Sequence, residues 1–157
     1  MWAALSVLAN PAGVGVVSAL TIYGVGKYVT ISKRDDARSA LTALTRAMVA
    51  CGARGPLPDT SEWVPADASD VSGKKYESRG SDWSSQGAFS CSGCRLSQPQ
   101  YFRYRWLRSA RNSGRFEAEA DLNGDGKTDV WANQPVSCRA GKCELYYQSV
   151  SQPSFRF

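Results

Sequence analysis

The sequence of 157 residues contains no histidine. Histidine is the side chain that most often acts as a general base or binds a metal ion, because its pKa lies near neutral pH. Its absence excludes catalytic triads that depend on histidine, and it excludes histidine-rich metal sites. No internal repeat is visible. The balance of 19 Lys and Arg over 14 Asp and Glu is +5, which indicates a soluble, mildly basic surface.

Charge is also missing from the first 26 residues, and the first charged residue is Lys27. About 20 apolar residues are enough to cross a bilayer, and such a stretch can also be buried among copies of itself. A secretory signal peptide would begin with a basic segment, and no basic residue precedes this stretch. The sequence therefore predicts an apolar N-terminal helix stem at residues 1–32 and a water-soluble head at residues 33–157.

An amphipathic helix follows the stem directly. Small and apolar residues recur there at steps of three and four, which places them on one helix face suited to packing against a sheet. These residues are Ala37, Leu41, Leu44, Met48 and Cys51. Gly52 favours the end of the helix, so we predict a head helix at residues 33–51. Within the stem, Pro11 and its neighbouring glycines disfavour helix, and we expect residues 10–15 to be non-helical or stretched in an assembled state.

The rest of the head divides into a loop and a sheet. Residues 52–100 are rich in Gly, Pro, Ser and Asp, which predicts a long loop. Residues 101–106 and 115–120 alternate with a period of two, which indicates an antiparallel hairpin. Shorter candidates for a third and a fourth strand are residues 130–132 and 144–147. We therefore place the antiparallel sheet within residues 101–157.

The sharpest local motif is DLNGDGKTD at residues 121–129. Oxygen-bearing side chains stand at its first, third, fifth and ninth positions, a glycine stands sixth, and the seventh residue offers a backbone carbonyl, as in EF-hand-like calcium loops. The predicted calcium ligands are Asp121, Asn123, Asp125, Lys127 and Asp129. The bidentate Glu at position twelve is missing, because Ala132 stands there. The alternative is a polar β-turn, in which three aspartates would repel each other without a cation.

Five cysteines in a small domain indicate an oxidising compartment and disulfide bonds, with one cysteine left over. Structural disulfides are the favoured use: Cys138 and Cys143 can close a small loop, and Cys51 can reach either Cys91 or Cys94. The spacing of Cys91 and Cys94 also admits a thioredoxin-like redox motif, but its Ser-rich flanks do not fit one. A four-cysteine zinc site with Cys138 and Cys143 is a further alternative.

Arginines interleaved with aromatic residues lie in the region of the predicted hairpin, a pattern that can form a nucleic-acid-binding ribbon. They are Arg103, Arg105, Arg108, Arg111 and Arg115. Glu117 and Glu119 on the adjoining strand are suitable cross-strand partners for these arginines. We therefore favour a solvated, ion-paired face over nucleic-acid binding.

Residues 14–29, VGVVSALTIYGVGKYV, resemble the apolar N-terminal helix of bacterial type IV pilin-like proteins, which runs directly into an amphipathic half. Residues 71–76, 97–104 and 116–126 resemble the pilin head, in which an F-x-A-x-A strand leads into an acidic, glycine-containing loop. The family's usual glutamate near the N-terminus is replaced here by Ser6, as in tip-type pseudopilins.

The resemblance implies an α+β fold shaped like a ladle, with a long N-terminal helix packed on a small antiparallel β-sheet. It implies a structural subunit of a type IV pilus-like surface filament (a fimbrium), held in the inner membrane before assembly. Its partners would be copies of itself or sister pilins, and we expect no catalysis and no small-molecule substrate. Calcium is the expected cofactor because of the motif at residues 121–129, not because of the resemblance. Alternatives are a minor pilin or type II secretion pseudopilin, a monomeric membrane-anchored binding domain, or a thiol oxidoreductase.

Overall fold

The computed structural model describes residues 11–122, 124–139 and 141–145. Side chains are described from residue 32 onward, except at positions 123, 129–134, 140 and 145. The chain divides into two compact units, Met1–Asp35 and Asp36–Phe157. Within the part that the structure describes, no helix is both long and apolar enough to cross a membrane.

Helix α1, Pro11–Gly52, contains the predicted head helix and begins earlier in the chain. Proline is tolerated in the first turn of a helix, because the N–H that it lacks would have no partner within the helix. Residues 11–15 are helical in this structure. Asn10 lies outside the described residues, and the expectation for an assembled state stays a prediction.

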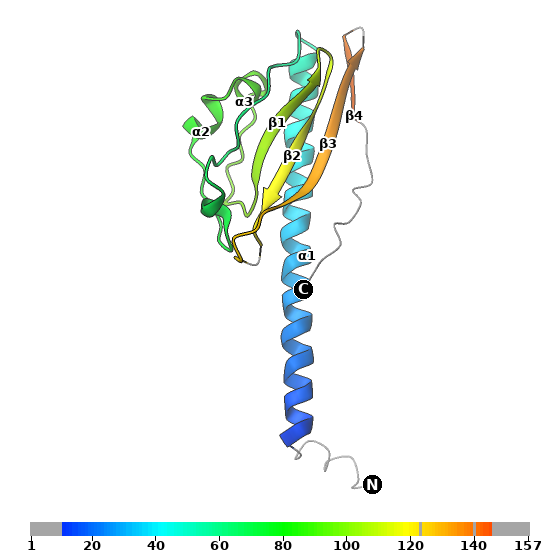
Figure 1. Ribbon diagram of the computed structural model, residues 1–157. Helices are drawn as coiled ribbons and strands as arrows, with labels where there is room; N and C mark the ends of the chain where they lie inside the picture. The colour runs from blue at the N-terminus through cyan, green and yellow to red at the C-terminus, as the bar shows by residue number, and fades with distance from the viewer. Residues whose placement is uncertain (1–10, 123, 140, 146–157) are drawn as a thin grey trace. The chain divides into compact units, whose positions relative to one another are not determined.

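Among the described residues, four strands form one antiparallel sheet in the order β1-β2-β3-β4 (Figure 1). They are β1 Arg103–Ala110, β2 Ser113–Ala120, β3 Asp129–Arg139 and β4 Lys142–Leu145. The register pairs Trp106 with Phe116 and Cys138 with Cys143. The α+β class and the antiparallel sheet are confirmed. The part of the predicted sheet beyond residue 145 lies outside the described residues.

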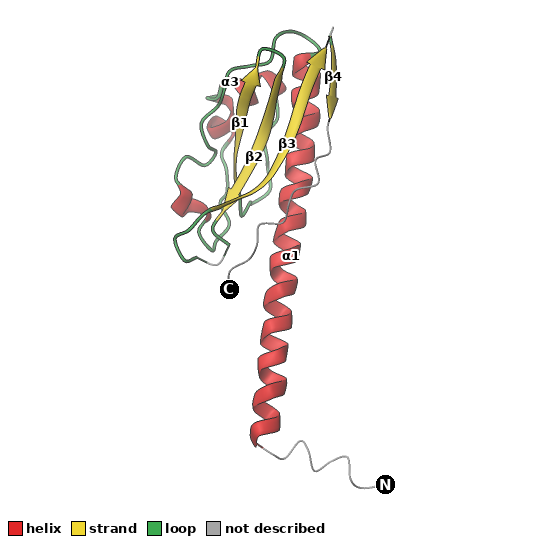
Figure 2. Cartoon of the chain, turned by 45° about the vertical axis from the view of Figure 1, so that its right-hand side comes forward, coloured by secondary structure: helices red, strands yellow, loops and turns green. Residues whose placement is uncertain are grey.

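The core of the Asp36–Phe157 unit lies between helix α1 and one face of the sheet (Figure 2). The predicted helix stripe is confirmed, since all five of its residues are buried: Ala37, Leu41, Leu44, Met48 and Cys51. Tyr104, Trp106, Phe116 and Ala118 supply the sheet side of the same cluster. The rings of Trp106 and Phe116 lie 5.0 Å apart. Burial of these large apolar side chains is the main stabilising term of the head.

The segment between α1 and β1, predicted as one long loop, contains three short helices. They are η1 Ala68–Val71, α2 Gly80–Ser84 and α3 Gly87–Ser92. Part of this segment runs beside β1: the Ser61 N–H donates to the Trp106 carbonyl (2.9 Å), and Val64 bridges Tyr104. This pairing covers backbone groups at a sheet edge that would otherwise be open to other chains.

Candidate functional site

The loop between β2 and β3 is organised around the carboxylate of Asp121, which is only 2% exposed. Its Oδ1 accepts hydrogen bonds from the N–H groups of Gly124 (2.7 Å) and Asp125 (3.1 Å). Its Oδ2 accepts from the N–H of Gly126 (2.9 Å) and from the hydroxyl of Ser72 (2.6 Å). The side chain at the first position of the motif therefore folds the loop around itself.

These hydrogen bonds also determine the charge state of Asp121. Burial by itself would raise the pKa of the carboxyl group, because it disfavours the charged form. The hydrogen bonds from Ser72, Gly126, Gly124 and Asp125 outweigh burial and hold the pKa below its usual value. Successive backbone N–H groups that converge on one anion provide this kind of stabilisation. Asp121 is therefore an ionised carboxylate whose charge is compensated inside the loop.

A second segment holds the loop from outside. The N–H of Gly73 donates to the backbone carbonyl of Asp121 (2.8 Å), next to the hydrogen bond from Ser72. Ser72 and Gly73 directly follow η1, whose N-cap Asp67 accepts a hydrogen bond from the Ser69 N–H. We call the two hydrogen bonds from Ser72 and Gly73 to Asp121 the 72–73 clasp. Sequence reasoning missed it, because the two partners lie 49 positions apart and no local pattern links them.

The structure locates three of the five predicted calcium ligands. Asp121 points into the loop, Asp125 is exposed with its Oδ1 accepting from the Lys127 N–H (2.8 Å), and Lys127 is exposed. Asn123 and the side chain of Asp129 lie outside the described residues. Among the residues whose placement is described, no group of three or more His, Cys, Asp or Glu side chains is arranged to hold a metal ion. Calcium binding stays a prediction.

The oxygen atoms of this loop are chemically suitable ligands for calcium, but they would have to rearrange to bind it. Asp121 and Asp125 are hard oxygen donors in a tight turn, and Gly126 has the positive φ (82°) that a glycine at the sixth position permits. The Asp121 carboxylate has about four lone-pair sites, and four hydrogen bonds occupy them. A cation would therefore replace at least one of these hydrogen bonds. The same geometry also suits the alternative of a self-contained polar turn.

The predicted cross-strand ion pairs are confirmed for Arg103 with Glu119 (2.7 Å) and for Arg105 with Glu117 (2.8 Å). Glu117 also pairs with Arg115 (2.8 Å), which lies two residues earlier in the same strand, β2. Both glutamates are buried, and a buried carboxylate needs such partners because isolated charge is costly to desolvate. These three arginines therefore neutralise the protein's own carboxylates, which weakens the case for a nucleic-acid ribbon.

The arginines of β1 also contact an aromatic residue and form a further ion pair. The guanidinium groups of Arg103 and Arg105 lie 4.7 Å and 4.4 Å from the ring centroid of Trp63, at cation–π distance. Arg108 pairs with Asp59 (2.5 Å). Trp63 and Asp59 both come from the segment before β1, so the arginines tie that segment to the sheet.

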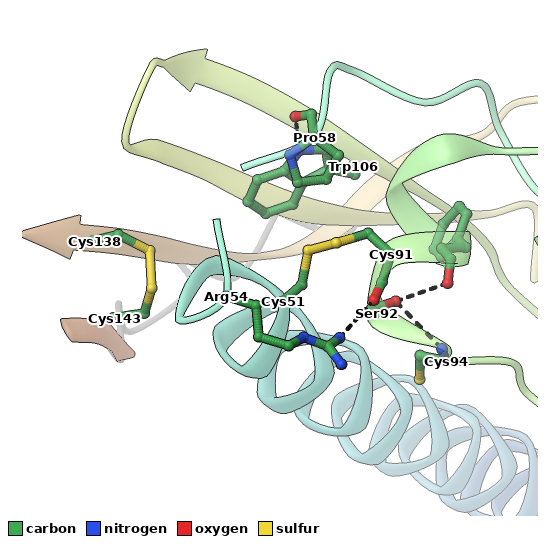
Figure 3. The surroundings of a disulfide bond; sticks show 10 residues. Cys51, Arg54, Pro58, Cys91, Ser92, Cys94, Trp106, Cys138 and Cys143 are labelled. Carbon is green, nitrogen blue, oxygen red and sulfur yellow. Dashed lines mark hydrogen bonds between the residues drawn. A yellow bond between two sulfur atoms is a disulfide. The ribbon is translucent and has the colours of Figure 1, made fainter. Parts of the chain in front are cut away.

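The cysteines form two disulfide bonds (Figure 3). Cys51 of α1 is joined to Cys91 of α3, and Cys138 of β3 is joined to Cys143 of β4. Cys94 is a free thiol, and burial raises its pKa. Both favoured pairings are confirmed. The zinc and Cys91–Cys94 redox alternatives would need sulfurs that are bonded elsewhere in this structure.

No protein-family model matches this chain, and no curated protein or solved structure was found to match it.

Proposed function

We propose that this chain is a structural subunit of a type IV pilus-like surface filament, with stems bundled in the filament interior and heads on the outside. The observation that carries the proposal is the uncharged stretch of residues 1–26, followed by a helix whose residues 36–52 form one core with an antiparallel sheet. In this proposal the fold is the pilin-like ladle, and the inner membrane holds the stem before assembly.

The stem must remain shielded from water when it leaves the bilayer. The 26 uncharged and mostly apolar residues of this stretch cannot be exposed to water without a large hydrophobic penalty. Neighbouring stems would keep them buried, and small residues permit close approach between helices. The small residues of this stretch are Ala12, Gly13, Gly15, Ser18 and Ala19. The composition of the stem therefore supports the proposed self-association or association with sister pilins.

The disulfides support a location in the periplasm or at the cell surface. Bonds such as Cys51–Cys91 persist in oxidising surroundings, including the bacterial periplasm and the cell surface. A head that is exposed outside the cell benefits from such cross-links, because a domain of about 120 residues buries only a modest core.

The first prediction concerns where the chain is found in cells. Mechanical shearing should release it in filaments that are visible by negative-stain microscopy, and mass spectrometry of that material should identify it. An integral membrane protein serves as the control for contaminating vesicles. Retention of the chain in the membrane fraction, under conditions that shear filaments, would contradict the filament and favour a membrane-anchored monomer.

Calcium in the 121–129 loop is the second part of the proposal. Asp121, Asn123, Asp125 and Asp129 would supply side-chain oxygens, and Lys127 would supply its carbonyl. Sites of this kind in extracellular modules often bind in roughly the 0.1–1 mM range. The cation would neutralise the carboxylates of the turn and thereby order the ends of β2 and β3.

The second prediction is that calcium raises the melting temperature of a fragment of residues 34–157. Calcium at a hundredfold excess over Kd adds about 2.7 kcal/mol to the folded state, which corresponds to roughly 10 °C. Circular dichroism melts with calcium and with EGTA measure the difference. Asp125→Ala should abolish the response, whereas Glu62→Ala, an exposed carboxylate outside the loop, should retain it. Identical melting of the wild type in both conditions would mean that the loop is only a turn.

A further inference from the structure

A pocket of about 390 Å³ lies within the Asp36–Phe157 unit. Asp36, Ser39 and Ala40 of α1 line it, together with Lys75 and residues of the segment that enters β1. Small-molecule sites typically have volumes of about 300–1,000 Å³ and combine apolar walls with a few polar groups. This pocket has that composition, since Phe102 and other apolar residues of the segment lie beside the polar groups of α1 and Lys75.

One residue of the pocket, Gln100, has an unusual side chain. Its backbone is held by hydrogen bonds to and from Tyr76 (2.9 and 2.8 Å), and the residue is only 7% exposed. Within the described residues, neither its amide nitrogen nor its amide oxygen has a hydrogen-bond partner, and both atoms are buried. Buried polar groups nearly always have partners, and an unpaired one costs about 1–3 kcal/mol. The missing partners of Gln100 therefore point to a group from outside the chain.

The charges around the pocket favour a neutral occupant. Asp36 and Lys75 both line it and have opposite signs, so neither an anion nor a cation is selected. The Lys75 ammonium also lies 5.0 Å from the centroid of the Tyr101 ring, a cation–π contact. Tyr101, Phe102 and Tyr104 supply aromatic surface to the same pocket, which suits the apolar face of a small ring or methyl group.

We propose that this pocket binds a small neutral ligand bearing a secondary amide, which pairs with the side-chain amide of Gln100. A glutamine amide offers one acceptor and two donors in a single plane, which complement the N–H and C=O of an N-acyl group. Both Gln100 amide atoms are closed to solvent in this structure, so pairing with the ligand requires the side chain to turn towards the pocket. An N-acetylated amino sugar and a peptide bond share this chemistry. The site is independent of the filament and calcium proposals.

The third prediction tests this site on the full chain in detergent micelles by NMR of the ¹⁵N-labelled side-chain amides. The Gln100 signal, assigned by its loss in Gln100→Leu, should shift saturably on titration with N-acetyl-D-glucosamine or with N-acetylglycine methylamide. Loss of the amide pairing in Gln100→Leu should weaken binding at least about tenfold, read from the backbone amide of Tyr101. Gln98→Leu is the matched control, because Gln98 lines the same pocket but is exposed.

Each outcome of this experiment decides the proposal. A saturable shift with the sugar, with the peptide or with both supports it and identifies the source of the amide. Linear or absent shifts with both probes, or equal binding by Gln100→Leu, overturn it in favour of water as the partner of Gln100. D-glucose, which has no amide, keeps the test valid if Gln100→Leu does not fold: an equal response of the wild type to D-glucose also overturns the proposal.

Discussion

Replacing both Cys51 and Cys91 with alanine is expected to lower the free energy of unfolding of the head by about 4 kcal/mol. This disulfide joins residues 40 positions apart, from the end of α1 to α3. Without the disulfide, the loop that it closes is no longer restrained in the unfolded chain, which therefore gains conformational entropy. The folded state loses only this covalent link between the two helices. The Cys138–Cys143 bond spans 5 positions, and the same replacement there should cost only about 2 kcal/mol, because a short loop gains less entropy.

Urea unfolding of residues 34–157 under non-reducing conditions measures both effects. All variants carry Cys94→Ser, so that the free thiol cannot exchange with a disulfide, and this single variant is the reference. The transition of the Cys51/Cys91 double variant should move to a lower urea concentration than that of the Cys138/Cys143 variant. Equal losses in the two double variants would contradict the loop-length argument and indicate that packing around the sulfurs dominates.

The Asp121→Ala variant is expected to lose about 3 kcal/mol of stability even when calcium is absent. The substitution removes the acceptor of four hydrogen bonds and leaves the Ser72 hydroxyl and three N–H groups without their partner. Each lost hydrogen bond contributes about 1 kcal/mol, less where water can replace the carboxylate. Because Gly73 also binds the Asp121 carbonyl, the 72–73 clasp should loosen together with the loop.

Urea unfolding in EGTA, combined with amide hydrogen exchange, checks this prediction separately from any role of calcium. Exchange should accelerate at Gly124 and Gly126 in Asp121→Ala, because their N–H groups lose the carboxylate. Asp125→Ala is the matched control from the same loop: Asp125 is exposed, and its loss in EGTA should stay within about 0.5–1 kcal/mol. An unchanged unfolding midpoint for Asp121→Ala would show that the loop is held by its glycines and flanking strands instead.

Several features of the head were predictable because they depend on near neighbours in the chain. The buried stripe of α1, for example Leu41, Leu44 and Met48, follows from the helical period. The ion pairs of Glu117 and Glu119 follow from the period of two and a hairpin register. The Cys138–Cys143 bond closes a short turn.

Other features depend on which distant segments come together, and no local pattern encodes that. Cys51 could have reached Cys91 or Cys94, and only the placement of α3 selects Cys91. A side chain at Gly52 would collide with the sulfurs of Cys138 and Cys143, so this glycine is needed for close approach as well as for ending the helix.

The sequence by itself determined the uncharged N-terminal stretch, the absence of histidine chemistry, the helix stripe and the first hairpin, because composition and periodicity act over a few neighbouring residues. Tertiary structure decided the partner of Cys51, the clasp of Ser72 on Asp121 and the burial of the Gln100 amide. Each of these joins segments far apart in the chain, and the free energy that selects such contacts comes from packing the whole core.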